Sequence, residues 1–220
     1  MCLAYCMNHE AARRTLADIQ AMDVSASLAV CDVSEPDMQK EMFERVQERW
    51  GRVDIFVANA ARTAFSSAVD MDLRSWRRTM QLNVEAFLLG SQLAAQIMRT
   101  HGGGRIVGLS SLGSRFYTPN YAALGVAKAA IENLTRYLAV ELASFQISVN
   151  AVCGGFIDTE SMKMIPGYDD LTAGIVAGTP AARLGRPEDL AGVVAFLCSS
   201  DADWVRGQTI IADGGFSLSL

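Results

Sequence analysis

The sequence predicts an α/β fold in which helices cover both faces of a doubly wound parallel sheet. Short apolar runs rich in β-branched residues alternate with longer stretches of helical periodicity, as in sheets whose strands are joined by crossover helices. The chain has 220 residues, half of them apolar, which suits one domain with a sizeable core. No internal repeat, low-complexity tract or Pro/Ser-rich linker divides it, so residues 1–220 are expected to form a single domain.

The boundaries of the expected elements rest on residues that begin or end helices. Ser34 is expected to cap a helix with Pro36 in its first turn, where a missing N–H costs nothing. The glycine run 102–104 is expected to end a long helix, since glycine adopts the left-handed conformation easily. The expected strands are 1–5, 27–33, 53–58, 105–109, 147–152 and 209–212, and the expected helices are 8–22, 34–50, 74–100, 121–143 and 187–199.

Composition argues against several classes of partner. The formal net charge of −5 gives no reason to expect a nucleic acid. No apolar run approaches the roughly 18 to 20 residues of a membrane span, and the N-terminus lacks the pattern of a signal peptide. The five cysteines are scattered and the chain has two histidines, so a zinc cluster is not expected. A cytoplasmic protein with reduced thiols, no metal site and no membrane partner is the expectation.

Small and polar residues follow four successive expected strands. The carboxyl ends of parallel strands meet at one edge of an open sheet, which is where ligands bind. Any one of these groups is weak evidence, because turn formers commonly end strands, but turns alone do not account for four at the same edge. The groups are Asp32 and Val33, Asn59 to Ala61, Ser110 and Ser111, and Cys153 to Gly155.

Several stretches along the whole chain together form a highly specific pattern. They are residues 30–34, 51–61, 82–87, 104–111, 126–130, 147–152, 183–191 and 206–215. With them the sequence resembles the short-chain dehydrogenase/reductase family, which implies a Rossmann-like doubly wound sheet and hydride transfer with a nicotinamide cofactor.

The resemblance is closest to the type III enoyl-acyl carrier protein reductases. The family's catalytic lysine corresponds to Lys128, and the position four residues earlier, a tyrosine in most members, is Leu124 here. Tyr121 lies seven residues before the lysine, as in the enoyl-reductase branch. Spacing alone favours a plain helix-start aromatic, but the stretches 110–121, 135–142 and 154–159 resemble the type III enzymes specifically. Seven residues are two helical turns, about 10 Å along one face. A ketone takes hydride on the carbon that bears its oxygen, whereas an enoyl thioester takes it two carbons from the carbonyl carbon. The different position of the phenol along the helix could therefore match the different position of the substrate oxygen.

The resemblance implies roles for four residues. Tyr121 would hydrogen-bond the developing enolate oxygen, and Lys128 would hold the nicotinamide ribose and lower the pKa of the phenol. Asn83 would anchor a water in a proton relay, and Ser111 would hold the substrate or the phenol. The plainer interpretation of Tyr121 is a partly buried aromatic residue at a helix start. The plainer interpretation of Asn83 is a buried amide that is hydrogen-bonded to backbone. Tyr117 competes with Tyr121, and Ser110 and Ser114 compete with Ser111.

The resemblance to the type III enzymes implies NADPH as the cofactor. NADH remains the alternative, because residues 5–9 hold neither an acid to repel the 2′-phosphate nor an arginine to bind it. Asp32 resembles the adenine-contacting aspartate, while Ile157 and Thr159 resemble residues that hold the carboxamide and the pyrophosphate. Residues 160–182 resemble a substrate lid, in which Met162, Met164, Ile165 and Tyr168 suit an acyl chain or the core equally well. The expected cofactor-binding residues are Asp32, Val33, Asn59, Ala60, Ala61, Tyr121, Lys128, Gly155, Ile157 and Thr159.

The family's first strand, glycine-rich turn and helix, which seat the pyrophosphate, have no counterpart in this sequence. Met1 aligns inside the second strand, so a unit of about 30 residues is absent. The two strands 1–5 and 27–33 are then expected to be cut off from the remaining sheet. A start codon placed too far downstream, a truncated product and a rearranged sheet are the competing explanations.

The leading functional hypothesis is NADPH-dependent reduction of the 2,3 double bond of trans-2-enoyl thioesters in fatty-acid or related acyl-chain assembly. Its substrate would be carried by acyl carrier protein or CoA. The alternatives are a reductase or dehydrogenase acting on another carbonyl substrate, and a non-catalytic truncated member. The resemblance implies a homotetramer or homodimer through the helices around 74–100 and 121–143 and the C-terminal strand.

Overall fold

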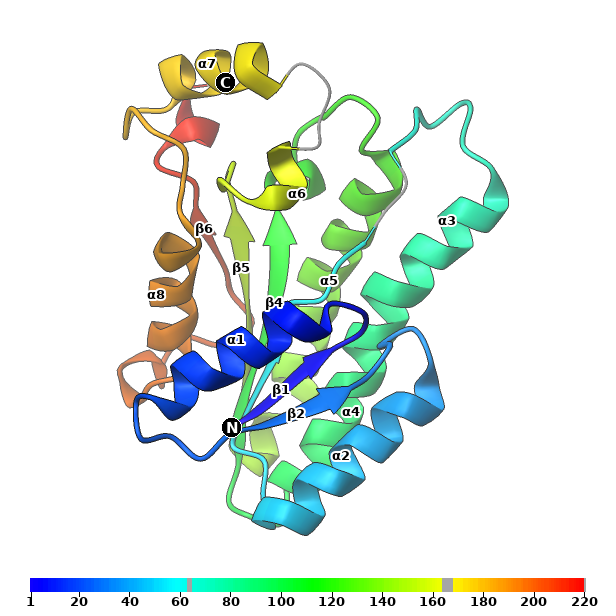
Figure 1. Cartoon of the computed structure of the whole chain (residues 1–220), viewed down its shortest axis with the longest axis vertical. Helices are drawn as coiled ribbons and strands as arrows, with labels where there is room; N and C mark the ends of the chain where they lie inside the picture. The colour runs from blue at the N-terminus through cyan, green and yellow to red at the C-terminus, as the bar shows by residue number, and fades with distance from the viewer. Residues whose placement is uncertain (63–64, 164–167, 220) are drawn as a thin grey trace.

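The structure is a computed structural model that describes residues 1–62, 65–163 and 168–219. Its strands and helices alternate as the sequence predicts (Figure 1). The strands are β1 (Cys2–Tyr5), β2 (Ser27–Val30), β3 (Ile55–Ala58), β4 (Gly104–Ser111), β5 (Ile147–Gly154) and β6 (Thr209–Ala212). The α-helices are α1 (His9–Gln20), α2 (Pro36–Trp50), α3 (Leu73–Met80), α4 (Ala86–Met98), α5 (Ala122–Glu141), α6 (Glu160–Lys163), α7 (Tyr168–Gly178) and α8 (Pro187–Leu197).

All strand pairs are parallel, and they form two separate sheets. Strands β1 and β2 pair with each other alone, whereas the other sheet has the order β3-β4-β5-β6. The longest pairing joins β4 to β5 from Gly104–Ile147 to Ser111–Gly154. The expectation that the first two strands lie apart from the rest is therefore confirmed. A rearranged sheet is excluded for the part of the chain that the structure describes.

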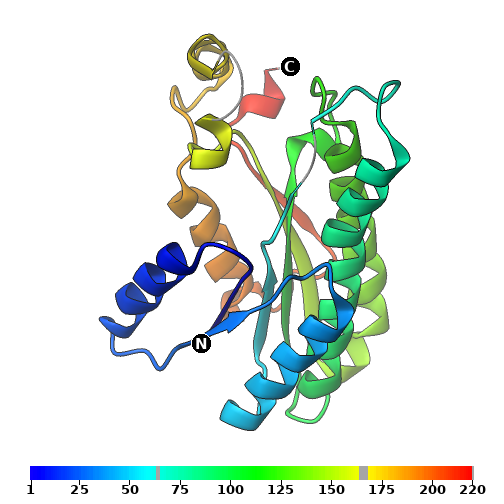
Figure 2. The ribbon, with the colours of Figure 1, turned by 45° about the vertical axis from the view of Figure 1, so that its right-hand side comes forward.

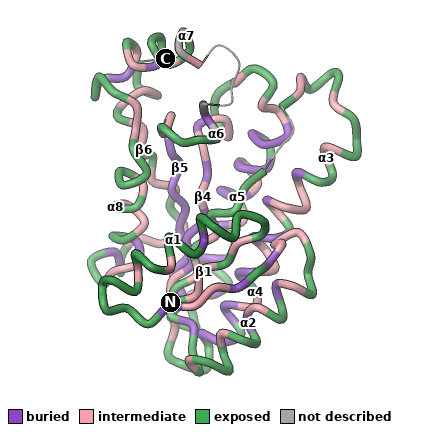
Figure 3. The backbone as a smooth tube through the Cα atoms, viewed as in Figure 1, coloured by how far each residue is buried: buried purple, intermediate pink, exposed green. Residues whose placement is uncertain are grey.

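Helices cover both faces of the sheets, which confirms the doubly wound arrangement. Helices α1 and α8 lie on one side, and α2, α4 and α5 lie on the other (Figure 2). The core is centred on β4 and β5, and every residue of β5 is buried, because this strand is flanked by two others and covered on both faces (Figure 3). Helix α1 is mostly exposed, and its one buried residue is Ala12.

Two local predictions need correction. Ser34 does not cap α2: the N-cap position is Glu35, and the Ser34 hydroxyl instead donates to Asp32 Oδ1 at 2.6 Å. Asp32 thus competes for this hydroxyl, in an Asx-type turn that also binds the Ser34 backbone N–H. The long helix expected over 74–100 is interrupted by one π-helical turn, Gln81–Glu85, between α3 and α4.

The split sheet predicts uneven local stability. Two strands covered by one largely exposed helix are marginal by themselves, whereas β4 and β5 are central and buried. Amide hydrogens of Leu28 to Val30 are therefore expected to exchange about tenfold or more faster than those of Ile106 to Leu109. Hydrogen–deuterium exchange followed by mass spectrometry of peptides from both strands measures this ratio. Equal protection would show that the two sheets open as one cooperative unit.

Candidate active site

A serine and a tyrosine hydroxyl meet at the carboxyl edge of the larger sheet. Ser111 is the last residue of β4, and its Oγ lies 3.2 Å from the Tyr121 hydroxyl. The two competing serines are directed elsewhere, since Ser110 Oγ and Ser114 Oγ donate to Glu132 Oε1 at 2.7 and 2.6 Å. Among the serines considered from the sequence, the geometry thus brings Ser111 to the phenol.

Tyr121 is the N-cap residue of α5, so the helix begins just after the phenol and not with it. Its ring packs closely on Gly113, where an added Cβ would lie 2.5 Å from the ring. The Phe65 ring lies against it with a centroid separation of 6.1 Å. Tyr117, the competing phenol, is 90% exposed. The close approach of Gly113 and the cap position together fix Tyr121 beside the end of β4.

The pKa of Tyr121 is raised, mainly because burial disfavours the phenolate, although the Ser111 hydrogen bond opposes this. The expectation that Lys128 lowers the pKa of this phenol is wrong for this structure. The Lys128 ammonium is turned toward the Leu109 carbonyl, to which Nζ donates at 2.7 Å. Ser111 is therefore the neighbour that favours the ionised phenol.

Lys128 is a buried cation within helix α5, with 5% of its surface exposed. Desolvation lowers its pKa from 10.5 to about 8. An ammonium group has three N–H donors, and the bond to Leu109 uses one of them. Leu124, at the position where most of the family carries a tyrosine, is 7% exposed and apolar. Tyr121 therefore supplies the phenol on this side of Lys128.

Asn83 sits in the π-helical turn between α3 and α4. Its Nδ2 donates to the Thr79 carbonyl at 2.8 Å and to the Arg62 carbonyl at 2.9 Å. The second bond ties the helix to the loop that follows β3. Asn83 Oδ1 is buried with no hydrogen-bond partner among the described residues. An unpaired buried oxygen of this kind is costly, which fits a polar group that is bound in the working site.

The expected cofactor residues fall into two sets. Asp32 and Val33 follow β2 of the smaller sheet, and the pKa of the Asp32 carboxyl is lowered because it accepts two hydrogen bonds from Ser34. The second set follows the strands of the larger sheet. Asn59, Ala60 and Ala61 follow β3 and are exposed, whereas Gly155, Ile157 and Thr159 follow β5, where only Thr159 is exposed. The structure brings this second set to the edge that carries Ser111, Tyr121 and Lys128.

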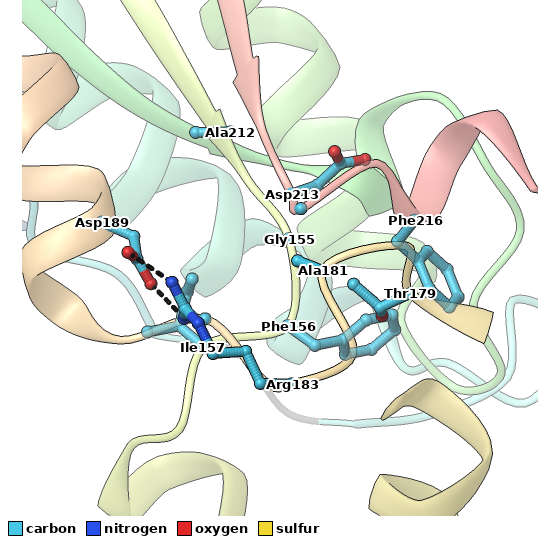
Figure 4. Close-up of a pocket in the computed structure, with 12 residues that line it drawn as sticks. Gly155, Phe156, Ile157, Thr179, Ala181, Arg183, Asp189, Ala212, Asp213 and Phe216 are labelled. Atoms are coloured by element: carbon cyan, nitrogen blue, oxygen red, sulfur yellow. Dashed lines mark hydrogen bonds and ion pairs between the residues drawn. The ribbon is translucent and has the colours of Figure 1, made fainter. Parts of the chain in front are cut away.

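Gly155 and Ile157 also line a cavity of about 160 Å³ between the loops after β5 and β6 (Figure 4). Arg183 and Asp189 form a two-bond ion pair at its wall, with N–O distances of 2.6 and 2.9 Å. This pair ties the segment before α8 to the first turn of that helix. The volume is below the roughly 300 Å³ that is typical of small-molecule pockets.

The described residues fit one half of a nicotinamide dinucleotide. At Gly155 an added Cβ would meet Asp213 Cα at 2.7 Å, so the glycine lets the loop after β5 pack directly on the loop after β6. Lys128 and the unpaired Asn83 Oδ1 offer a donor and an acceptor nearby on the same half of the domain. The pyrophosphate half lacks its usual cradle, since no glycine-rich turn leads from β1, β2 or β3 into a helix among the residues described.

Sequence reasoning missed two residues of this region. Glu132 is buried in α5 and accepts hydrogen bonds from both competing serines, and Arg115 Nη2 reaches its other oxygen at 2.9 Å. A glutamate in the middle of an amphipathic helix gives no signal that distinguishes it from a solvated one. Its partners become visible only when β4 and α5 are packed together.

A family model described as "Enoyl-(Acyl carrier protein) reductase" matches residues 1–217. The chain belongs to the short-chain dehydrogenase/reductase family. It is similar to the 1-cyclohexenylcarbonyl-CoA reductase of Streptomyces collinus, with 38% identity over 97% of this chain and 76% of that protein. The observed fold and the match confirm the resemblance drawn from the motifs, and with it a nicotinamide-dependent oxidoreductase.

Solved structures give the same fold with both forms of the cofactor. A gluconate 5-dehydrogenase from Burkholderia cenocepacia in complex with NADP and tartrate superposes with a TM-score of 0.89 at 25% identity, covering 100% of this chain and 86% of that one. A 7α-hydroxysteroid dehydrogenase complexed with NADH superposes with a TM-score of 0.91 at 31% identity, covering 97% and 83%. These short-chain relatives therefore leave the choice between NADH and NADPH open.

The described residues show four further features. None of their helices is both long and apolar enough to cross a membrane. No group of three or more potential metal ligands gathers among them. All five cysteines are free thiols. Of the expected lid residues, Met162 is buried and Tyr168 donates to Asp158 at 3.2 Å, while Met164 and Ile165 lie outside the described residues.

Proposed function

We propose that this short-chain reductase uses NADPH to reduce the 2,3 double bond of trans-2-enoyl thioesters. The observation that carries the proposal is the Ser111–Tyr121 pair, whose hydroxyl oxygens are 3.2 Å apart. It supplies a phenol seven residues before Lys128, while Leu124 at the usual position is apolar and buried. The family description and the name of the Streptomyces collinus relative support an unsaturated acyl thioester as the substrate.

In this proposal the cofactor supplies hydride to the β-carbon, and the chain's own residues manage charge and position. The Tyr121 hydroxyl donates a hydrogen bond to the thioester oxygen as it becomes an enolate, in a site where burial strengthens the interaction. Ser111 holds the phenol through its own hydroxyl. The enolate then takes the proton of the Tyr121 hydroxyl and becomes the saturated thioester, and Asn83 holds a water that returns a proton to the resulting phenolate. Lys128 would hold the nicotinamide ribose with its remaining N–H donors.

The thioester would be carried by CoA or acyl carrier protein, in fatty-acid or related acyl-chain assembly. Residues 59–62 after β3 and 158–160 after β5 are exposed, which leaves space at this edge of the sheet for such a carrier. We also propose that the chain forms a homotetramer or homodimer through α5. Two apolar side chains of this helix, Tyr137 and Val140, are exposed and lie one turn apart. Light scattering measures the mass of the assembly. A monomer at all concentrations would contradict this assembly.

A second candidate is a reductase or dehydrogenase of ketones or alcohols. It is supported by the gluconate and hydroxysteroid dehydrogenases of similar structure, and a serine–tyrosine pair can equally donate to a ketone oxygen. A non-catalytic member is the third candidate, since the described residues lack the pyrophosphate cradle. These candidates differ in which substrate, if any, is reduced.

Crotonyl-CoA and acetoacetyl-CoA distinguish the candidates because they offer a conjugated double bond and a ketone on the same carrier. Wild-type protein is expected to oxidise NADPH with crotonyl-CoA at least about tenfold faster than with acetoacetyl-CoA. Absorbance of the reduced nicotinamide follows both reactions, and NADH is compared in parallel. A preference for acetoacetyl-CoA would establish the second candidate. Folded protein that oxidises neither nucleotide with either thioester would favour the non-catalytic one.

A further inference from the structure

Glu132 is a buried carboxylate placed behind the serine–tyrosine pair. It lies in α5 and is 6% exposed. Its Oε1 accepts from Ser110 Oγ at 2.7 Å and from Ser114 Oγ at 2.6 Å, and its Oε2 accepts from Arg115 Nη2 at 2.9 Å. The carboxylate thus joins the end of β4 and the turn that follows it to the helix that carries Lys128.

These bonds surround Ser111 without touching its hydroxyl. Ser110 precedes it, and Ser114 Oγ lies 2.7 Å from the Ser111 carbonyl oxygen. Ser110 Oγ also lies 3.4 Å from the Lys128 carbonyl oxygen on α5. The backbone of Ser111 is therefore held on both sides by groups that converge on one carboxylate. Its side chain points the other way, to the Tyr121 hydroxyl.

We propose that Glu132 is a positioning residue that sets the Ser111–Tyr121 contact by locking β4 and the following turn against α5. The carboxylate accepts at both oxygens, and charge-assisted bonds of this kind are about twice as strong as neutral ones. Arg115 offsets the cost of burying the negative charge. Glu132 does not reach the reacting atoms, so it acts through Ser111. The kinetic part of this inference rests on the proposed reductase function.

Glutamine is the sharp replacement because it keeps the shape and removes one acceptor. Its oxygen can face Arg115, but its NH2 group must then meet Ser110 and Ser114, which previously donated to the carboxylate. The serine protons must then turn to the backbone carbonyls of Ser111 and Lys128, so neutral bonds replace the charge-assisted bonds that join β4 and the following turn to α5, and the clamp on the Ser111 backbone weakens. Glu141→Gln is the matched control, since Glu141 lies on the same helix and is exposed.

Glu132→Gln is expected to lower kcat for crotonyl-CoA reduction about tenfold while the KM values of both substrates stay within about twofold. Glu141→Gln is expected to leave all three constants unchanged. Because Glu132 acts through Ser111, the same substitution in a Ser111→Ala background is expected to cause no further loss of kcat. Additive losses in the double variant would show that the carboxylate acts independently of Ser111 and would overturn the proposal.

A measurement that needs no turnover separates this proposal from the proposed function. Protein labelled with 13C at tyrosine Cζ gives resonances for five tyrosines, and Tyr121→Phe assigns the one of interest. Glu132→Gln is expected to shift the Tyr121 resonance in the same direction as Ser111→Ala, with Glu141→Gln leaving it in place. If wild type reduces no thioester but these shifts appear, the positioning role stands and the proposed function fails. An unmoved Tyr121 resonance in a folded Glu132→Gln protein overturns the positioning role even if the melting temperature falls.

Discussion

Tyr121→Phe is expected to lower kcat/KM for crotonyl-CoA by about 100- to 1,000-fold, the usual cost of removing one donor from a developing oxyanion. The substitution removes one oxygen and keeps the ring that packs on Gly113 and against Phe65. Fold and NADPH affinity are therefore expected to change little. Steady-state rates with crotonyl-CoA and NADPH, together with nucleotide binding followed by fluorescence, measure the two quantities separately.

Tyr117→Phe is the matched control for that experiment. Tyr117 is four residues away in the same segment, yet it is 90% exposed and has no hydroxyl contact with Ser111. Its variant is expected to retain wild-type kcat/KM. If Tyr117→Phe lost the activity and Tyr121→Phe kept it, the phenol of the site would be misassigned, and the seven-residue spacing to Lys128 would carry no mechanistic meaning.

The strand and helix order followed from residue patterns because each element has a strong local signal. The run Ile147–Val152 is apolar and β-branched, and it became the buried centre of the sheet. The boundary near Ser34 was wrong because Asp32 forms a local turn that the helix signals did not indicate. Asp32 accepts from both the hydroxyl and the backbone N–H of Ser34, and Glu35 then takes the N-cap position.

The site was predictable where it depended on motif spacing and unpredictable where it depended on packing. The spacing from Lys128 together with the motif of residues 110–121 pointed to Tyr121, whereas Ser110 and Ser114 still competed with Ser111 near the end of β4. Because side chains alternate along a strand, Ser110 and Ser111 lie on opposite faces of β4. Only the packing of α5 on the sheet shows that Glu132 lies on the same face as Ser110. The direction of the Lys128 ammonium was likewise set by tertiary burial, which no spacing encodes.

The separation of the two sheets has a physical consequence for cofactor binding. Asp32 and Val33 would contact the adenine end and Tyr121 and Lys128 the nicotinamide end, yet they belong to different sheets. A dinucleotide that binds both ends must hold the two sheets at a fixed separation. Part of its binding free energy then orders the link between them, so its affinity is expected to be lower than for an uninterrupted sheet.

Lys128→Met is expected to abolish detectable crotonyl-CoA reduction and at the same time to stabilise the fold by about 1 to 3 kcal/mol at neutral pH. Burial lowers the pKa of Lys128 from 10.5 to about 8, so the folded protein bears the cost of a desolvated cation. This difference in pKa corresponds to a free energy of about 3 kcal/mol. The stabilisation that is lost with the hydrogen bond to the Leu109 carbonyl is subtracted from it. Methionine fills similar apolar space without a charge. Urea unfolding measures the stability change, and Lys40→Met on the surface of α2 is the control.

The stability difference between Lys128→Met and the wild type is expected to change with pH, and the direction of this change tests whether the buried cation causes it. Below about pH 8, Lys128 is charged in both the folded and the unfolded chain, so the wild type bears the full cost and the variant is the more stable. Between about pH 8 and 10.5 the folded state has released a proton that the unfolded chain still binds, so the wild type gains stability relative to the variant. The advantage of Lys128→Met is therefore expected to shrink as the pH rises through this window. An advantage that stays constant from pH 7 to 10.5 would show that the ammonium is solvated in the folded state. In that case the burial of a cation would not account for the stability difference between the wild type and Lys128→Met.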